Sequence, residues 1–284
     1  MKIYRILLLC FCVLASSCSH AEQKEIYAKD IIKQLTKGKD VLVYNKIIMD
    51  DLDFTAVKNE QPLRTGQLQN VITGNVFFHS CVFMGNVTTN NKVGTGNQPT
   101  QTKFNENIIF QSCDFRGEAD FENAIVMGSA DFSQAKFRKK ANFNNFVVLG
   151  KDTYFSEIEA EDSFSMIYAS FGGNFYIMDG TFQKDFCLQN AMINGKLLAN
   201  GNTCSGNAEF DMMTVKGRAI FNYMQCEKQA SFIQSRFFDD AEFVGTNFAD
   251  SANYESAYFY GKLLLGDKEI PCPRKYEELI KTNN

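Results

Sequence analysis

Large apolar residues recur along the middle of the chain at alternating intervals of five and six residues. From Glu106 to Tyr260 the sequence divides into eleven-residue units, with one extra residue near Gly150. The fifth place of thirteen of the fourteen units is large and apolar, and the tenth place of all fourteen is apolar. A helix would place apolar residues three and four apart, and an alternating strand would place them two apart. Spacing near five therefore indicates short extended segments joined by tight turns.

Each unit also carries a small residue two positions before the central large one. In 117–149 the units read GEADFENAIVM, GSADFSQAKFR and KKANFNNFVVL, so that Ala119 precedes Phe121 with one polar residue between them. An earlier unit, GNVFFHSCVFM at 74–84, follows the same pattern with Phe78 and Phe83. Self-similarity at a fixed period over so many units is the signature of a solenoid.

These residues resemble the pentapeptide-repeat family, in its variant with alternating five- and six-residue sides. The clearest copies are ADFENAIV, ADFSQAKF, ANFNNFVV, AEFDMMTV and AEFVGTNF, and the resemblance covers 106–265 and the unit at 74–84. It implies an all-β fold, a right-handed quadrilateral parallel β-helix, in which the central large residue and the small residue before it both point inward. Two sides take eleven residues, so four sides predict roughly 22 residues per turn.

The repeat predicts a structural core of Phe side chains. The predicted core residues are Phe110, Phe115, Phe121, Phe132, Phe137, Phe143, Phe210, Phe221, Phe232, Phe237, Phe243 and Phe248. Between 162 and 198 the pattern changes, because large residues occupy the small site and the central site shrinks. The exchanged sets are Phe164, Phe175, Phe186 and Leu197 at the small site and Met166, Ile177, Leu188 and Ala199 at the central site. A constant packed volume explains this compensation.

The chain divides into four parts on this interpretation. Residues 1–17 are a signal peptide, 18–40 a linker with a capping helix, 41–265 the β-helix with loop excursions near 58–70 and 85–105, and 266–284 a C-terminal cap. Bare β-helix ends would expose unpaired strands, so short capping helices are expected at both ends. Ile31, Ile32 and Leu35 form the apolar side of the first, and the second is expected after Pro273.

The N-terminal residues predict export and a lipid anchor. Lys2 and Arg5 precede an apolar run of about ten residues, which is too short to span a bilayer. The sequence Leu-Ala-Ser-Ser-Cys that ends at Cys18 resembles the lipobox of bacterial lipoproteins, which implies that Cys18 is acylated. This predicts a protein of the bacterial cell envelope whose partner is the membrane. The alternative is cleavage after Ala21, which would leave a soluble periplasmic or secreted protein.

Composition and motifs give little indication of a catalytic, cofactor or metal site. Without residues 1–17, the 27 Lys and Arg residues face 33 Asp and Glu residues, a net charge of −6, which is mild and argues against a nucleic-acid partner. The two His residues lie far apart, and six Cys residues follow Cys18 without a C-x-x-C pair. We expect no catalytic residue, no cofactor and no metal site. Tyr254, Tyr258 and Tyr260 could form a ligand platform, although a stabilising contact is the simpler interpretation.

The sequence favours a non-enzymatic, lipid-anchored envelope protein that acts as a rigid scaffold or interaction surface, with an unknown protein or glycan partner. Some cytoplasmic members of the family imitate DNA, but the export signal and the mild charge argue against that role here. The alternative is a secreted or surface β-helix that binds or cleaves glycans. A convergent carboxylate cluster on one outer face would favour the enzyme, and an evenly distributed polar ladder would favour the scaffold. The oligomeric state stays open.

We predict that Cys18 is the acylated N-terminus of the mature protein. Several acyl chains would hold the protein firmly, because a single chain binds a bilayer only marginally. Intact mass spectrometry of the protein extracted from membranes checks this. A free N-terminus at Glu22 would contradict it.

Overall fold

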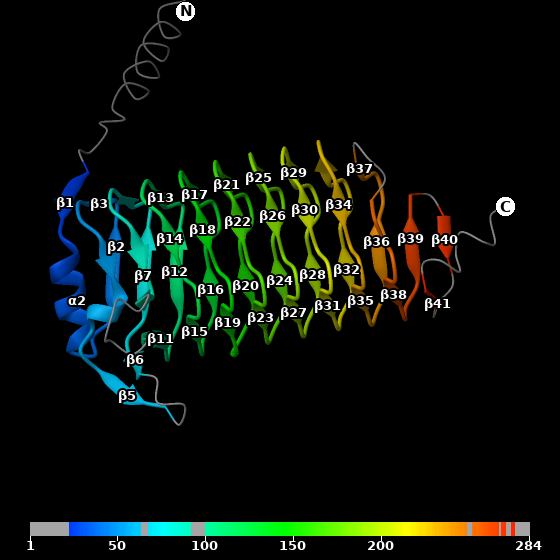
Figure 1. Cartoon of the computed structure of the whole chain (residues 1–284). Helices are drawn as coiled ribbons and strands as arrows, with labels where there is room; N and C mark the ends of the chain where they lie inside the picture. The colour runs from blue at the N-terminus through cyan, green and yellow to red at the C-terminus, as the bar shows by residue number, and fades with distance from the viewer. Residues whose placement is uncertain are drawn as a thin grey trace, which may run out of the picture.

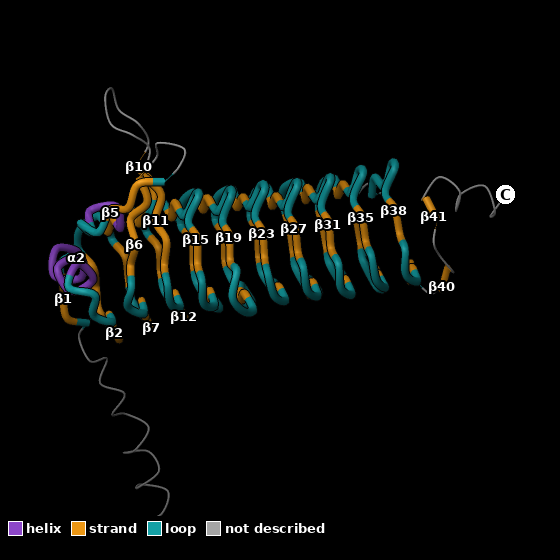
Figure 2. The backbone as a smooth tube through the Cα atoms, turned by 90° about the horizontal axis from the view of Figure 1, so that it is seen from below, coloured by secondary structure: helices purple, strands orange, loops and turns teal. Residues whose placement is uncertain are grey.

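The chain forms a straight parallel β-helix whose four walls enclose one apolar core (Figures 1 and 2). The computed structural model describes residues 23–63, 68–91, 100–248, 252–266, 268–270 and 274–275. The four sheets are named A to D, and the chain passes through them in the repeating order D, B, A, C. Sheets B and C are therefore opposite walls, and so are A and D. The predicted quadrilateral β-helix is confirmed.

Most strands have two residues, with one side chain pointing into the core and one pointing out. Sheet A contains β1 (Lys24–Ile26), β3 (Lys46–Ile48), β8 (Val82–Phe83), β13 (Asp114–Phe115), β17 (Lys136–Phe137), β21 (Glu159–Ala160), β25 (Thr181–Phe182), β29 (Thr203–Cys204), β33 (Gln225–Cys226) and β37 (Asn247–Phe248). Sheet B contains β2 (Val41–Tyr44), β7 (Val76–His79), β12 (Ile108–Gln111), β16 (Ala130–Asp131), β20 (Thr153–Tyr154), β24 (Phe175–Tyr176), β28 (Leu197–Leu198), β32 (Ala219–Ile220), β36 (Ala241–Phe243), β39 (Leu263–Leu265) and β40 (Lys268–Ile270).

The other two walls follow the same plan. Sheet C contains β4 (Leu52–Asp53), β9 (Val87–Thr88), β14 (Ala119–Asp120), β18 (Ala141–Asn142), β22 (Phe164–Ser165), β26 (Phe186–Cys187), β30 (Ala208–Glu209) and β34 (Ala230–Ser231). Sheet D contains β5 (Glu60–Pro62), β6 (Leu68–Ile72), β11 (Thr100–Phe104), β15 (Ile125–Val126), β19 (Val147–Val148), β23 (Ser170–Phe171), β27 (Met192–Ile193), β31 (Thr214–Val215), β35 (Arg236–Phe237), β38 (Tyr258–Phe259) and β41 (Arg274–Lys275), with β10 (Asn90–Asn91) paired to β11.

The strand register confirms the turn of 22 residues. Phe115 pairs with Phe137, and Phe182 pairs with Cys204, which pairs in turn with Cys226. The extra residue near Gly150 appears as a single longer turn, since Phe137 pairs with Ala160. Stacking the same repeat position in one column explains why the sequence keeps its register so strictly.

The first two full turns are longer, and the additional residues lie where the excursions were predicted. Val41 pairs with Val76, and Val76 with Ile108, so these turns take 35 and 32 residues. The excursions are narrower than predicted, however. Strands β9 and β11 belong to the walls, so the expectation that all of 85–105 leaves the rod as a loop was wrong, and 92–99 lie outside the described residues.

The excursion near 58–70 also contains regular structure. Strand β5 pairs antiparallel with β6, which lies in the wall and continues in parallel to β11. In Figure 2 these strands form the thickened end of the rod near the helix. Backbone pairing decides the boundary, because a polar segment joins a sheet wherever its N–H and C=O groups can continue a ladder.

The predicted Phe core lies inside the rod, with one exception. Eleven of the twelve predicted Phe side chains are at most 1% exposed, and many rings stack directly on the ring one turn away. The centroids of Phe110 and Phe132 are 5.3 Å apart, and those of Phe132 and Phe155 are 4.7 Å apart. Phe248 is only partly buried, because β37 is the last strand of its sheet among the described residues.

The exchanged segment keeps the core filled by a different arrangement of rings. Phe164, Phe175 and Phe186 are fully buried at the small site, as are the smaller residues at the central site. Phe175 stacks on Phe171 with centroids 4.1 Å apart, and Phe186 stacks on Phe182 at the same distance. The rings thus contact a neighbour across a corner rather than one turn away, which is the physical form of the predicted volume compensation.

Left-handed residues at every eleventh position turn the chain at two corners. Residues 112, 123, 134, 145, 157, 168, 179, 190, 201, 212, 223, 234, 245 and 256 all have φ between +52° and +73°. Their backbone N–H groups bond to the next turn, as Asn123 does to the Asn144 carbonyl at 2.9 Å. Asn and Gly adopt this conformation readily, but Tyr168 and Tyr223 do so only because the ladder holds them.

The two ends are closed differently. At the N-terminal end, α2 (Ala28–Thr36) buries Ala28, Ile31 and Leu35 against the first turn and ends before Gly38, whose φ is +66°, as the sequence predicted. The additional strand β1 was missed. The 3-10 helix η1 (Phe54–Ala56) follows β4.

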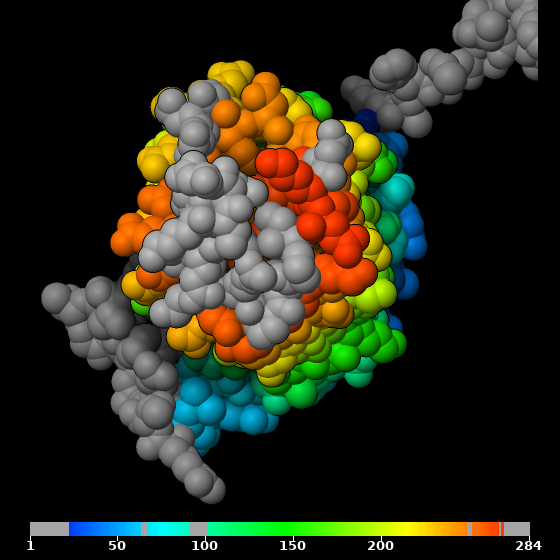
Figure 3. Space-filling model, turned by 90° about the vertical axis from the view of Figure 1, so that its right-hand side faces the viewer, coloured from blue at the N-terminus to red at the C-terminus, as the bar shows by residue number. Residues whose placement is uncertain are grey.

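At the C-terminal end, the described residues of the cap include two short strands, which the sequence did not predict. Strands β40 and β41 pair antiparallel with β39 and β38, and Figure 3 views the rod from this end. These antiparallel strands provide hydrogen-bond partners for the backbone N–H and C=O groups of β39 and β38, the last wall strands of sheets B and D. The predicted apolar stripe of Tyr276, Leu279 and Ile280 lies outside the described residues.

The column that holds Cys204 and Cys226 offers a test of core packing. Both are buried free thiols on paired strands of sheet A. Cys226→Phe should overpack the column and lower the free energy of unfolding by roughly 1–3 kcal/mol, whereas Cys226→Val should be nearly neutral. Chemical denaturation of the two variants measures the difference. Equal stability of the two would show that the site is loosely packed.

Asn202 is a fully buried polar residue inside the rod. Its amide nitrogen donates to the carbonyls of Ile177 and Ala199 at 2.7 and 2.8 Å, and its side-chain oxygen accepts from the Gly180 N–H at 2.8 Å. A Cβ at residue 180 would meet that oxygen at 3.0 Å and the Phe182 ring at 3.1 Å. Glycine at 180 therefore makes room for the amide one turn away.

We predict that Asn202→Ala lowers the free energy of unfolding by about 1–3 kcal/mol, because buried backbone groups lose their partners. Asn200→Ala is the matched control, since Asn200 lies two residues away and is partly exposed. The midpoints of urea denaturation give the comparison. Identical midpoints for both variants would mean that water replaces the lost amide.

Candidate interaction surface

The carboxylates of sheet C come closest to an enzyme-like arrangement. Asp120 and Glu122 both accept from the Asn142 amide, at 3.0 and 3.2 Å. Four turns along the rod, Glu209 and Asp211 line a shallow polar groove of about 200 Å³. Asp211 Oδ1 accepts from the Ser231 hydroxyl and from the Ile233 N–H at 2.8 Å. These carboxylates therefore serve as acceptors that tie one turn to the next.

Cys187 lies beside this groove but is a poor nucleophile. Burial, followed by the charge of Glu209, raises the pKa of the Cys187 thiol to about 12. The thiol is therefore protonated at neutral pH, whereas nucleophilic cysteines act as thiolates. Within the described ranges, no group of three or more His, Cys, Asp or Glu side chains could hold a metal ion.

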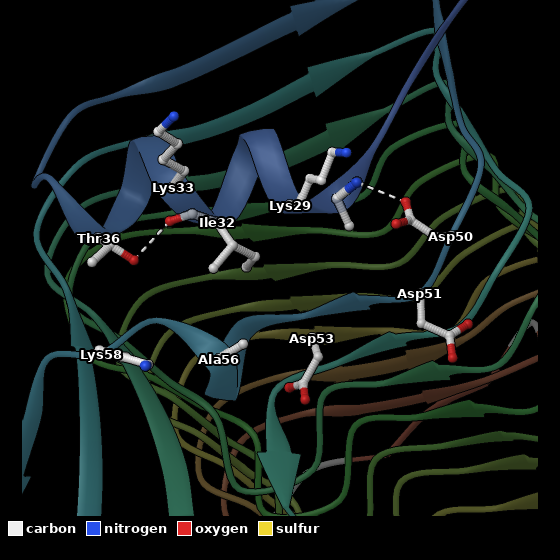
Figure 4. A pocket seen from close by; sticks show the side chains of 10 residues that line it. Lys29, Ile32, Lys33, Thr36, Asp50, Asp51, Asp53, Ala56 and Lys58 are labelled. Carbon is white, nitrogen blue, oxygen red and sulfur yellow. Dashed lines mark hydrogen bonds between the residues drawn. The ribbon is translucent and has the colours of Figure 1, made fainter.

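A second groove, of about 420 Å³, lies between α2 and the segment from Asp50 to Lys58 (Figure 4). Its carboxylates also have structural roles. Asp50 accepts from the N–H of Ala28 at 2.7 Å, and Asp53 caps η1 by accepting from the Thr55 N–H at 2.8 Å. The groove joins the capping helix to the rod, and its aspartates orient backbone groups rather than converging on a common point.

The outer face of sheet A has the charged character that the sequence predicted for the whole surface. Asp114, Lys136 and Glu159 follow one another on neighbouring strands, and Lys136 pairs with Glu159. Arg138 bridges Asp114, at 2.9 Å, and Glu161. Such partly exposed pairs contribute little each. Sheet A is a solvated polar ladder.

The outer face of sheet B is different, because its outward positions are mostly apolar. One column, taken strand by strand from β2 to β39, reads Leu42, Phe77, Ile109, Asp131, Tyr154, Tyr176, Leu198, Ile220, Glu242 and Leu264. Eight of these ten residues are aliphatic or aromatic. Along most of sheet B, an apolar residue therefore takes the place of the polar residue that lies between the small and the large residue in units such as Ala119-Asp120-Phe121.

Tyr154, Tyr176, Leu198 and Ile220 form an uninterrupted stretch of this column, named here the apolar ladder. All four side chains are partly exposed. The rungs are spaced by ~4.8 Å, so the four of them span about 14 Å along the rod. A contiguous apolar stretch on a solvent-facing wall is a candidate interaction surface.

Satisfied carboxylates bound the apolar ladder at both ends. Asp131 accepts from the Gln111 amide at 2.7 Å and from the Ser133 N–H at 2.9 Å. Glu242 pairs with Arg218 and accepts from the Asn222 amide at 2.9 Å. The polar rim and apolar centre match the general anatomy of protein interfaces.

The two tyrosines of the ladder present their edges outward. Their ring centroids are 4.9 Å apart and the planes differ by 6°, so each covers one face of the other. Burial raises the pKa of Tyr154, whose hydroxyl donates to Asp152 at 3.5 Å. The phenol therefore stays neutral at physiological pH, and its proton is directed to Asp152.

The other predicted site residues are not brought together. Tyr254 is buried and stacks on Phe232 with centroids 5.1 Å apart, while Tyr258 and Tyr260 contact each other on the surface at 4.5 Å. The three tyrosines therefore do not form one platform, and the simpler interpretation, a stabilising contact, describes Tyr254. His79 lies on the outer face of sheet B near Tyr44 and Phe77. Cys18 lies outside the described residues.

The comparison with protein families agrees with this geometry. A model described as pentapeptide repeats (9 copies) matches residues 100–145, which include the stacked Phe columns of sheets A to D. Residues 100–145 are pentapeptide repeats. No curated protein and no solved structure matched the chain.

The strand register extends the pentapeptide-repeat rod well beyond the matched residues, since 22-residue pairing continues to Phe259. None of the described helices is long and apolar enough to cross a membrane. The apolar ladder lies outside the matched segment, and only the outward positions of its two-residue strands distinguish it. The sequence does carry a signal for the ladder, because the residues that follow Thr153, Phe175, Leu197 and Ala219 are all apolar or aromatic. The signal can be recognised only once these following residues are known to face outward.

Adjacent residues on β28 test which side chains face outward. Leu197 is fully buried and Leu198 is partly exposed. Leu197→Ala should lower the free energy of unfolding by about 2–5 kcal/mol. Leu198→Ala should lower the free energy of unfolding by about 1 kcal/mol or less, because folding buries only part of the Leu198 side chain. Thermal unfolding of both variants is the measurement, and a reversed order would place the ladder inside the rod.

Proposed function

We propose that the chain is a non-enzymatic, lipid-anchored scaffold of the cell envelope, and that it binds a protein partner through the apolar ladder of sheet B. The apolar ladder is the observation that carries this proposal. The β-helix supplies rigidity, since each turn pairs with the next through backbone hydrogen bonds. The signal-like segment that ends at Cys18 supports export and anchoring.

The geometry of the tyrosines favours a protein partner over a glycan. A sugar stacks on the face of an aromatic ring, but Tyr154 and Tyr176 cover each other's faces. The other face of each ring is next to the following residue of the column, Asp131 beside Tyr154 and Leu198 beside Tyr176. A partner would therefore contact the ring edges and the hydroxyl groups. Tyr edges beside Leu198 and Ile220 suit apolar side chains with a few hydrogen-bond acceptors.

Two observations support a non-enzymatic role. The paired carboxylates of sheet C already accept hydrogen bonds from neighbouring turns, and the Cys187 thiol stays protonated. A glycosidase needs two carboxyl groups that flank a substrate bond, with one free to donate a proton. The groove beside Glu209 is shallow and open, which suits a scaffold wall.

Site-specific photocrosslinking in native envelopes tests the proposal. A photoreactive residue replaces Leu198 on the apolar ladder or Ser165 on the opposite wall, sheet C. We expect one discrete protein adduct from position 198 and none from 165, and we expect Ile220→Asp to abolish it by placing a charge in the interface. Adducts of equal yield from both walls, or a carbohydrate adduct at 198, would overturn the proposal.

A further inference from the structure

The capping helix α2 carries a positively charged outer face. Lys29, Lys33 and Lys37 follow at intervals of four residues, so they lie on one stripe. This stripe is opposite to Ala28, Ile31 and Leu35, which pack on the rod. All three lysines are exposed, and none takes part in an ion pair within the described part of the chain.

Nearby carboxylates offset this charge only in part. Asp30 is the single acidic residue of the helix and lies at the edge of the stripe. In Figure 4 Asp51 and Asp53 lie across the groove from Lys29 and Lys33. Asp50 accepts from the backbone at the start of the helix. The outer face of the cap therefore presents three ammonium groups to solvent that form no ion pair with any described residue.

The chain leaves the rod beside this face. Four residues lie between Cys18 and Gln23, and the five steps from one to the other span at most ~18 Å even in a fully extended chain. If Cys18 carries the lipid anchor, as the proposed function holds, Gln23 must lie within about that distance of the bilayer surface, and α2 begins five residues further along the chain. Exposed Tyr27 adds an aromatic ring next to Lys29, whose ammonium is 5.4 Å from the ring centroid. Tyr side chains favour membrane interfaces.

We propose that the stripe of Lys29, Lys33 and Lys37 binds anionic lipid headgroups and stands the rod upright on the membrane. The partner is thus an anionic bilayer surface, and the sites bind phosphate groups as point charges. Ten strands of sheet A at ~4.8 Å spacing carry the far end of the rod about 43 Å from the first. Docking at the cap leaves all four walls, and the apolar ladder with them, open to solvent.

Vesicle binding of the unacylated protein tests the headgroup contact. The fragment 22–284 suits this test because every buried apolar residue described lies at Ala28 or later, so the fragment keeps the whole core. We expect the fragment to sediment with phosphatidylglycerol vesicles and to be released from them by high salt. It should not sediment with phosphatidylcholine vesicles. Each lysine near the surface is worth about a fivefold change in partitioning, so Lys29→Gln, Lys33→Gln and Lys37→Gln together should weaken binding about 100-fold.

The matched control removes the same charge elsewhere. Lys139→Gln, Lys140→Gln and Lys151→Gln neutralise three exposed lysines along the body of the rod, and this triple variant should bind as the unmodified fragment does. Equal loss in the two triple variants would mean that only net charge matters and would overturn the proposal. Equal binding to both kinds of vesicle, or to neither, would also overturn it.

Orientation is tested on the acylated full chain in phosphatidylglycerol vesicles. A dye at Glu255→Cys, near the far end of the rod, should transfer little energy to an acceptor in the bilayer, and transfer should rise when the three helix lysines are replaced. Unchanged transfer would contradict the upright orientation. A free N-terminus at Glu22 in the native protein would remove the anchor but leave the vesicle result standing, so the two proposals fail separately.

Discussion

The structure depends on the in-register stacking of residues one turn apart. Along most of the rod each strand pairs with the strand 22 residues away, and this pairing places an inward side chain directly above its counterpart. A Phe ring therefore meets another Phe ring at about the strand spacing, as Phe110 and Phe132 do at 5.3 Å. Hydrogen bonding and apolar packing act along the same axis, so a shift of one residue would lose both.

The same constraint explains the residues that are not apolar. A wall of two residues leaves no length for gradual turns, so corner residues adopt φ near +55° and polar side chains bond to backbone groups of the next turn. Asn75 and Asn107 show this, each accepting from the backbone one turn further along. Buried Asn202 extends the principle into the core, where Gly180 leaves it the necessary space.

The outward positions do not have to stack in the core, so their side chains differ from wall to wall. The inward positions of sheets A and B are equally apolar, but sheet A points a charged ladder to solvent while sheet B points Tyr154, Tyr176, Leu198 and Ile220. The N-terminal capping helix α2 also has two different faces. Its apolar face closes the rod, and its lysine face points away from the rod. On the two proposals made above, a rigid rod with one apolar wall and one basic end would bind a protein and a membrane at once without changing shape.

The sequence by itself determined the architecture. The spacing of five and six residues, the Ala119 and Phe121 pairing and the exchange around Phe164 all follow from packing one large residue per wall, so the turn length and eleven of twelve core Phe residues were predictable. The helix at Ala28–Thr36 was also predictable, because amphipathic periodicity and Gly38 are local signals.

Only the tertiary structure decided which polar segments join the walls, how the end is closed and what each wall presents. Strands β9 and β11 lie in polar sequence, and their pairing depends on backbone groups that every residue shares. The same holds for β40 and β41, which pair with β39 and β38 at the C-terminal end. The apolar ladder is assembled from residues 22 apart, and a spacing of that length has physical meaning only once the chain has wound one full turn.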